Sequence, residues 1–185
     1  MRSMRSMRST DSLVSWRRQA IRRIESVRRS TLAFIERLPE GEITRPGTID
    51  RWSVKDVLAH LMSCDEETVR RFKLIARGRG ERIFWFRTMA DADRFNARTV
   101  GRARRLGLPA VLRRMERAHA DVIEWLGRLP IESLSDPSHE YTVVSWLPVP
   151  GWRHEHGHLS EVRDWWREER KVRAAKRPRS ASKRR

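Results

Sequence analysis

The fold is decided first by residues 52–61, which read WSVKDVLAHL. Ser53 is a favourable helix N-cap, and Asp56 three residues later can bond back to the backbone at the start of the helix. The apolar residues that follow recur at helical spacing: Val54, Val57, Leu58, Leu61, Val69, Phe72 and Ile75. The stretch therefore predicts an amphipathic helix that ends near Gly78 and Gly80.

Three further segments have the same apolar spacing: 11–38, 109–129 and 152–166. In the first of them the arginine pairs between the apolar residues are expected to face solvent. Four amphipathic segments without convincing strand pairs predict an all-α four-helix bundle. The long connections at 81–107 and 130–151 predict at least one crossover rather than a simple series of hairpins.

The connections are predicted in less detail. Residues 39–51 contain two prolines and two glycines and predict a loop. Residues 91–105 are compatible with a helix that leads into the third long one, and the apolar run 83–86 is expected to cover an open end of the bundle. Residues 141–146 predict a short extended piece.

The formal net charge of +17 is unevenly distributed. Residues 1–30 hold nine arginines and two acidic residues, a net +7, and residues 170–185 hold nine basic residues and no acid, a net +9. Subtracting both from +17 leaves +1 for residues 31–169. The body is therefore nearly neutral, and the basic charge lies at the two ends.

This division predicts three parts: a disordered basic N-terminus at 1–10, a bundle at 11–172 and a disordered basic tail at 173–185. The N-terminus has no apolar run of the kind a secretory signal needs, and no stretch is long and apolar enough to predict a membrane span. The one cysteine, Cys64, fits a reducing compartment, so we expect a cytoplasmic protein.

The histidines predict a metal site. His154 and His158 are four residues apart, so they project from one face of a helix and can bind one ion. His156 lies roughly 200° around the helix from His154 and should point elsewhere. His60 lies on the core side of its own helix. If the two helices touch, three imidazoles converge and leave a coordination position open for water or substrate.

Other readings of the same residue types stay open. A histidine pair at this spacing also arises by chance, and His119 and His139 fit polar core or surface positions. Cys64, four residues after His60, fits a thiolate ligand or nucleophile, or more simply a small buried side chain. The tryptophans near these motifs fit a pocket wall or, more simply, core filling: Trp52, Trp146, Trp152, Trp165 and Trp166.

Residues 52–61 also resemble the second-helix motif of the DinB/YfiT-like proteins, especially their ClbS/DfsB branch. Residues 154–159, HEHGHL, are similar to the His-x-x-x-His motif of the fourth helix in that family. The resemblance extends over about residues 12–168. It implies a DinB-like bundle with a divalent metal at one end, bound by the following histidines: His60, His154 and His158.

The resemblance implies chemistry without fixing the reaction. Related proteins include thiol S-transferases, a mycothiol-dependent isomerase and a hydrolase that detoxifies a genotoxin. In each case a metal can lower the pKa of a thiol or water. We therefore expect a metal-dependent transferase or hydrolase for small electrophiles, in detoxification or a damage response. The ion is zinc, nickel, iron, manganese or copper, and a low-molecular-weight thiol is a candidate cosubstrate.

Glu161 is the carboxylate expected to matter most at this site. It continues the face of His154 and His158, where it can orient a ligand or relay a proton. Many family members have Gln at this position, so the hydrogen bonding around the ligands is expected to differ here. A surface ion pair is an equally simple reading of Glu161.

The partners expected are a small-molecule substrate and no membrane, and the sequence is compatible with a homodimer. Two alternatives to an enzyme remain. The basic termini favour weak, salt-sensitive and non-specific binding of nucleic acid through phosphates, although no helix-turn-helix or zinc-finger spacing is present. A helical bundle without catalytic activity is the other alternative.

Overall fold

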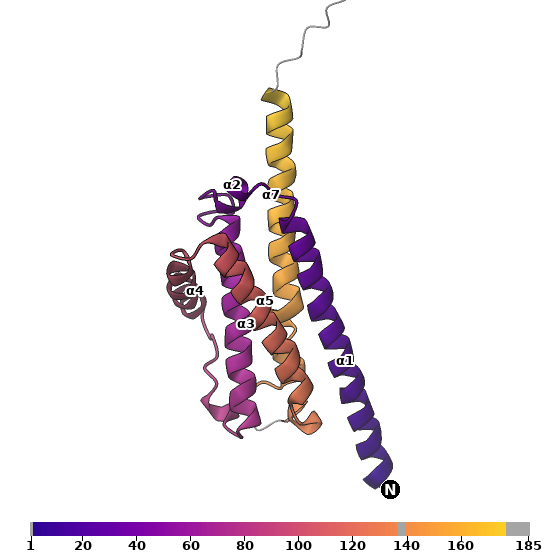
Figure 1. Ribbon diagram of the computed structural model, residues 1–185. Coiled ribbons are helices and arrows are strands. Elements are labelled where there is room, and N and C mark those ends of the chain that lie inside the picture. Colours follow the sequence, from indigo (N-terminus) through magenta and orange to yellow (C-terminus); the bar gives the residue numbers. More distant parts are fainter. Residues whose placement is uncertain (1, 137–139, 177–185) are drawn as a thin grey trace, which may run out of the picture.

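The computed structural model describes residues 2–136 and 140–176. Within these residues it is almost entirely helical, and four long helices lie side by side (Figure 1). The long helices are α1 (Arg2–Ile35), α3 (Val54–Ala76), α5 (Leu108–Arg128) and α7 (His154–Lys176). The prediction of an all-α bundle is confirmed.

Shorter elements connect the long helices. They are α2 (Glu40–Thr44), η1 (Gly80–Arg82), α4 (Met89–Ala103), η2 (Ile131–Leu134), α6 (Val143–Trp146) and the π-turn η3 (Val149–Arg153). α4 packs against the outside of α3 (Figure 1). In the described part of the chain, strand-like pairing is limited to one isolated bridge between Ile49 and Trp52. None of the helices in that part combines the length and apolarity needed to cross a membrane.

α3 and α5 run in the same direction, as two contacts along their length show. Near the middle of α3, Glu66 pairs with Arg114 of α5 at 2.6 Å. Further along both helices, the ammonium of Lys73 lies 5.5 Å from the ring centroid of Trp125. The second contact lies closer to the C-terminal end of both helices, so the helices are parallel. The chain that connects them must therefore cross back along the length of the bundle. The predicted crossover is confirmed, and α4 is part of it.

α1 and α7 also run in the same direction, opposite to α3 and α5 (Figure 1). Arg28 of α1 contacts Glu155 at the start of α7, and the guanidinium of Arg163 lies 5.5 Å from the ring of Phe34 further along. The bundle therefore has an up-down-down-up order. This order brings the first turn of α7 beside the first half of α3.

A buried ion network joins the four long helices at one level. Arg28 donates to Asp65 at 2.8 Å, to Glu155 at 2.8 and 3.0 Å and to the Met115 carbonyl at 3.2 Å. Burial is the main reason why the pKa of Asp65 is raised to about 6, although Arg28 opposes that shift. The prediction that the arginines of α1 face solvent is wrong for Arg28. This residue is buried because the carboxylates of Asp65 and Glu155 pair with it inside the bundle.

The apolar core has two parts, one on each side of this network. One part surrounds Phe72 of α3 and Leu126 of α5, and the other surrounds Leu58 of α3 and Val111 of α5. α1, α3 and α5 contribute to both parts, and α7 contributes to the second through Val162, so packing on both sides of the polar layer fixes the register of the first three helices.

The boundaries of α1 differ from those expected. We expected a helix from Asp11 or Ser12 after a disordered N-terminus, but residues 2–10 are the first turns of α1. The repeated Met-Arg-Ser sequence contains no proline or glycine, and Met and Arg favour helix, so nothing in the sequence stops the helix there. α1 ends at Ile35 rather than at Pro39, while Leu38 is still buried in the core.

Two of the connections are also more helical than expected. Inside the predicted loop 39–51, α2 begins after Pro39 and buries Ile43. The predicted extended piece at 141–146 is helical from Val143, because the Thr142 side chain caps α6 by accepting from the Ser145 amide. Both elements are too short for their periodicity to be recognised from sequence.

At the C-terminal end, α7 continues to Lys176, a few residues beyond the expected boundary at 172. Arg173 contacts Glu42 of α2 and Glu169 of α7, and these pairs stabilise the last turns of the helix. The remainder of the predicted tail, residues 177–185, lies outside the described residues, as does His139.

Candidate metal centre

The register of α3 fixes the position of His60. The hydroxyl of Ser53 accepts from the Asp56 amide at 3.0 Å, and the Asp56 carboxylate accepts from the Ser53 amide at 3.1 Å. This capping box confirms the predicted helix start. His60 then lies two turns into α3 with a side chain that is buried, and its ring is 5.1 Å from that of Trp52.

A kink before α7 fixes the positions of the other two histidines. Gly151 has non-helical backbone angles of φ −87° and ψ −125°, so the chain bends inside η3, three residues before His154. His154 is the first residue of α7 and His158 lies one turn later, with ring centroids 4.6 Å apart. The predicted pairing of these two side chains on one helix face is therefore present.

The three imidazoles converge between α3 and α7. The His154 Nε2 lies 3.1 Å from the His60 Nε2 and 3.0 Å from the His158 Nε2. One nitrogen from each residue can be chosen so that all three lie within 4.8 Å of one another. The set predicted from the sequence is thus brought together by the fold, and such a group could hold a metal ion.

Two of the three nitrogen pairs have the separation that binding to one divalent ion requires. Two nitrogens bound to one ion at about 2.1 Å, with an octahedral or tetrahedral angle between them, lie about 3.0–3.4 Å apart. The two nitrogen–nitrogen distances observed here, 3.1 and 3.0 Å, are close to that range. Three imidazoles leave coordination positions free, which is typical of catalytic rather than structural sites.

Electrostatics favour the metal-binding form of two of the ligands. Burial, followed by the neighbouring His154 and His158, lowers the pKa of His60 to about 3, although a hydrogen bond with Asn96 opposes that shift. Burial followed by His158 lowers the pKa of His154 to about 4, although Glu161 opposes that shift. Both imidazoles are therefore neutral at pH 7, and neutral imidazole is the form that binds metal.

Glu161 contacts a ligand. Its Oε2 lies 2.8 Å from the Nδ1 of His158, one turn earlier on α7. With the proton on Nδ1, His158 donates to this carboxylate and turns its unprotonated Nε2 toward the other two rings. Glu161 is 56% exposed and is not part of the pocket wall described below, so it is suited to orienting His158.

The remaining candidates lie apart from the cluster. His156 is exposed, as predicted, and His119 lies on α5, where burial followed by Arg28 lowers its pKa to about 4. The buried Nδ1 of His154 has no hydrogen-bond partner among the described residues. Glu155, adjacent to His154 in sequence, points instead into the ion network with Arg28.

A pocket of about 710 Å³ opens beside the three histidines. Its other walls come from α3, the segment before α4, α4 itself and the region around α6, and they include six aromatic side chains. The aromatic residues that line it are Trp52, Trp85, Phe86, Phe95, Tyr141 and Trp146. Its volume is in the range typical of small-molecule sites.

Only part of this pocket was predicted from the sequence. Trp52 and Trp146, two of the predicted wall residues, line it, whereas Trp165 and Trp166 pack against the second core cluster. The run 83–86 was predicted to cover an open end of the bundle, but two of its residues line the pocket. Arg71 was missed, although it lies on the same face of α3 as His60 at helical spacing, which is a usable signal.

Cys64 also lines the pocket, with its Sγ 3.8 Å from the His60 Nε2. Burial raises the pKa of this thiol, and Asp65 adds to the shift. The thiol is therefore protonated near neutral pH, which fits a small buried side chain better than a thiolate nucleophile.

The sequence of the chain matches a known protein family. The family model described as the DinB superfamily matches residues 23–170, a range that includes the three converging histidines and all four long helices in whole or part. No curated protein and no solved structure shows significant similarity to the chain.

Proposed function

The chain belongs to the DinB superfamily, and we propose that it is a metal-dependent enzyme that activates a thiol or water against a small electrophilic substrate. The observation that carries this proposal is the convergence of His60, His154 and His158 at the wall of a pocket lined partly by aromatic side chains. A cluster that can bind a metal, next to a cavity that can hold an organic molecule, is the arrangement such chemistry requires.

Each residue has a distinct role in the proposal. The imidazoles of His60, His154 and His158 hold a divalent ion, and Glu161 keeps His158 in the tautomer that offers Nε2. A metal bound there would lower the pKa of a thiol or water to near neutrality. The aromatic walls displace water from around the substrate, so the nucleophile meets the electrophile in an apolar environment.

The reaction class follows from the family resemblance. We propose membership of the ClbS/DfsB branch, and a transferase or hydrolase reaction in detoxification or a damage response. The candidate ions are zinc, nickel, iron, copper and manganese, of which all but manganese are typical of imidazole ligands. A low-molecular-weight thiol is the proposed cosubstrate if the reaction is a transfer. The single cysteine of the chain is consistent with a cytoplasmic location.

The test is an activity screen of purified protein loaded with one metal at a time. Each form is assayed with a panel of low-molecular-weight thiols and an activated aryl halide for transfer, and with activated esters for hydrolysis. The expected result is metal-dependent turnover that His154→Ala and His158→Ala abolish. His156→Ala is the matched control, because His156 is exposed on the same helix and should leave turnover unchanged.

Turnover that persists in His154→Ala protein shown to be metal-free would place the chemistry elsewhere and contradict the proposal. Metal binding without turnover on any member of the panel would favour the alternative of a helical bundle without catalytic activity.

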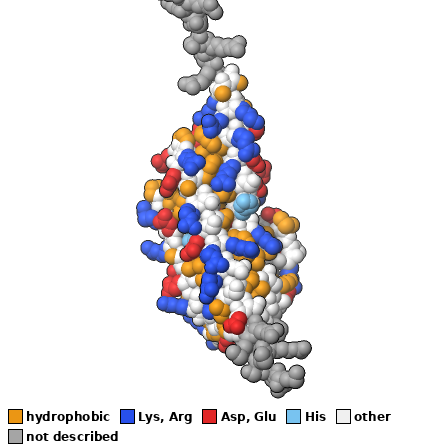
Figure 2. All heavy atoms as spheres, turned by 90° about the vertical axis from the view of Figure 1, so that its right-hand side faces the viewer, with side chains coloured by type: hydrophobic (Ala, Val, Ile, Leu, Met, Phe, Trp, Pro, Cys, Tyr) orange, Lys and Arg blue, Asp and Glu red, His pale blue; other side chains and the backbone are white. Residues whose placement is uncertain are grey.

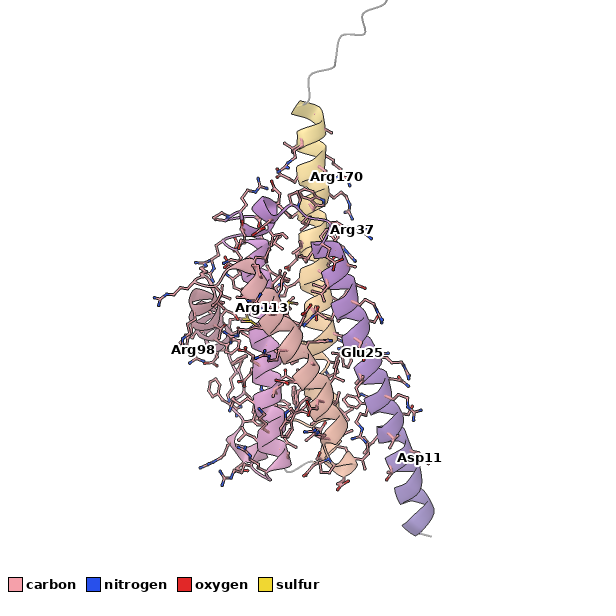
Figure 3. The ribbon with its side chains drawn as sticks, viewed as in Figure 1. Asp11, Glu25, Arg37, Arg98, Arg113 and Arg170 are labelled. Atoms are coloured by element: carbon pink, nitrogen blue, oxygen red, sulfur yellow. The ribbon has the colours of Figure 1, made fainter. Side chains whose placement is uncertain are left out.

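A second candidate function, non-specific binding of nucleic acid, is favoured by a groove between α1 and α7. The groove has a volume of about 830 Å³ and is lined by five basic residues and no acidic ones: Arg37, Arg163, Arg167, Arg170 and Lys171. Figure 2 shows Lys and Arg side chains flanking an apolar strip on this face. Figure 3 shows Arg37 and Arg170 near the same end of the molecule.

Phosphate contacts by such a groove would be independent of sequence and sensitive to salt. The aromatic side chains of Phe34 and Trp166 in the same groove could stack with unpaired bases. This candidate is compatible with the first, because the groove and the histidine cluster share no lining residue.

A further inference from the structure

The pocket follows one face of α3 away from the histidines. Its α3 residues are His60, Cys64, Glu67, Thr68 and Arg71. His60 and Arg71 are eleven residues apart, so their backbone positions differ by about 16 Å along the helix axis at 1.5 Å per residue. A molecule that filled the pocket would therefore extend from the histidine cluster to Arg71.

Arg71 is held in a fixed position by aromatic rings. The residue is only 6% exposed, and its guanidinium carbon lies 4.6 Å from the ring centroid of Trp85 and 5.5 Å from those of Phe86 and Trp146. These rings come from two different parts of the chain, residues 85–86 and α6. A guanidinium packed in this way has few alternative positions, so it is preorganised for a ligand.

The hydrogen-bonding capacity of Arg71 is only partly used. Its Nε donates to Glu67 at 3.0 Å. Its two terminal Nη nitrogens make no hydrogen bond within the described part of the chain, and they are not among the polar atoms sealed inside the protein without a partner. They are therefore accessible from the pocket and have a planar pair of donors to offer.

The charge at this end of the pocket is also incompletely balanced. Glu67 accepts two hydrogen bonds from Arg70, at 2.7 and 2.8 Å, in addition to the one from Arg71. One carboxylate is thus shared by two guanidinium groups, which leaves one positive charge. Among the described residues that line the pocket, Glu67 is the one acid and Arg71 is the one Lys or Arg.

We propose that Arg71 binds a carboxylate at one end of an elongated apolar ligand, whose other end reaches the histidine cluster. A carboxylate matches the planar donor pair of a guanidinium, and the aromatic walls between the two ends suit an alkyl or aryl segment. This inference deepens the proposed function, on which it rests for the reacting end, by assigning its substrate to amphiphilic organic acids.

The experiment uses full-length, metal-free protein and isothermal titration calorimetry. The probes are decanoate, which has an apolar chain and a carboxylate, and decanol, which has the same chain without the charge. The expected result is that the protein binds decanoate at least tenfold more tightly than decanol. In metal-free protein the carboxylate has no metal ion to bind at the histidine cluster. A preference for decanoate over decanol therefore shows that a positively charged side chain elsewhere binds the carboxylate.

Arg71→Gln is expected to reduce decanoate affinity at least tenfold and to leave decanol affinity unchanged. Arg71→Lys should keep part of the affinity, because it retains the charge but loses the planar donor pair. Arg70→Gln is the matched control: Arg70 also pairs with Glu67 but is 46% exposed and does not line the pocket, so its loss should be clearly smaller than that of Arg71→Gln. Thermal unfolding shows whether each variant is folded. If Arg71→Gln is not folded, the decanoate affinity of Arg71→Lys is compared with that of the wild type instead.

Three outcomes would overturn the inference: equal affinity for decanoate and decanol, equal losses in Arg71→Gln and Arg70→Gln, or a preference for decanoate that survives Arg71→Gln but is lost in His60→Ala. The first two would make Arg71 a structural partner of Glu67, and the third would place the carboxylate at the histidines. Because the titration uses metal-free protein, its result is independent of whether the protein proves to be a metal-dependent enzyme.

Discussion

Proton positions on the imidazole rings determine whether the histidine cluster can hold a metal ion. The pKa values of His60 and His154 are lowered far enough that both rings are neutral over the physiological range. Binding of a metal near neutral pH therefore requires no proton to be removed from either ring. The tautomer of His158 is the remaining variable, and the contact with Glu161 selects it.

The first prediction concerns Glu161→Gln. The amide can still bond to His158, but it no longer presents two acceptor oxygens, so the orientation of the ring is less strongly fixed. Metal affinity measured by competition with a chelator should fall roughly tenfold to a hundredfold, the range observed for such supporting contacts. Asp164→Asn, an exposed carboxylate on the same helix, is the control. Unchanged affinity in Glu161→Gln would show that the ring needs no support.

The second prediction concerns acid stability and His119, which is outside the histidine cluster. Burial lowers its folded pKa to about 4 from an ordinary value of 6.5. Above pH 6.5 the ring is neutral in both states and contributes nothing to the pH dependence. As the pH falls below 6.5, the unfolded state takes up a proton that the folded state does not, so stability is lost down to about pH 4.

His119→Leu should remove this loss. A shift of one pKa unit corresponds to about 1.4 kcal/mol. Between about pH 7.5 and about pH 4, the free energy of unfolding should therefore fall by up to about 3 kcal/mol more in the wild type than in the variant. Urea unfolding of metal-free protein at both pH values measures the difference, with His156→Leu as the exposed control. If wild type and His119→Leu lost stability equally, the folded pKa of His119 could not be lowered.

At the scale of the helices, the ion network of Arg28 is the feature that joins all four. Its acceptors come from α3, α5 and α7, while Arg28 itself belongs to α1. Because Glu155 is the neighbour of His154 in sequence, the same network that ties α7 to α1 also fixes the turn on which the first α7 ligand lies.

The third prediction follows from this network. Arg28→Met leaves Asp65 and Glu155 buried without their cation, and removing one partner of a buried ion pair typically costs about 3–5 kcal/mol. Urea denaturation should show a loss of that order, and Arg29→Met, the exposed neighbour, should be nearly neutral. A loss below about 1 kcal/mol for Arg28→Met would mean that the network contributes little to the stability of the bundle.

How much the sequence revealed depends on the element. The capping box of Ser53 and Asp56 and the spacing of His154 and His158 are local patterns, so the start of α3 and the pairing of these two histidines were predictable. Arg28 and Arg71 were not identified, because the burial of an arginine depends on partners that lie far away in sequence. α4 has only a few buried residues, and its position against α3 depends on packing that its own sequence does not indicate.

At the scale of the whole molecule, two surfaces with different chemistry are held apart by the bundle. The aromatic pocket lies between α3, α4 and the start of α7, whereas the basic groove lies between α1 and the later turns of α7. Figure 1 shows where these helices lie. α1 contacts α7 both at Glu155, through Arg28, and further along at Arg163, through Phe34, whereas His154 of the first turn of α7 faces His60 of α3.

The fourth prediction concerns the basic groove and the sequence beyond it. Deleting residues 177–185 removes five basic residues, Arg177, Arg179, Lys183, Arg184 and Arg185, and should leave the melting temperature unchanged. The same deletion should weaken binding of a single-stranded oligonucleotide. It should also reduce the salt dependence of that binding, by about 0.7 in the log–log slope for each phosphate that the shortened chain no longer neutralises.

Arg37→Gln with Arg170→Gln in the full-length chain separates the groove from the tail. A further loss of affinity in this double variant would support the groove as the binding surface. Binding that is independent of salt in every form would rule out phosphate contacts as its basis and contradict the fourth prediction.

The central claim is that His60, His154 and His158 together hold one divalent metal ion, and a direct titration tests it. Metal-free protein is titrated with zinc and with nickel by calorimetry, and bound metal is counted after dialysis. The account predicts one ion per chain, an affinity at least about a hundredfold lower in each of the three His→Ala variants, and no change in His156→Ala. Equal binding by the wild type and all three ligand variants, or an equal loss in His156→Ala, would contradict it.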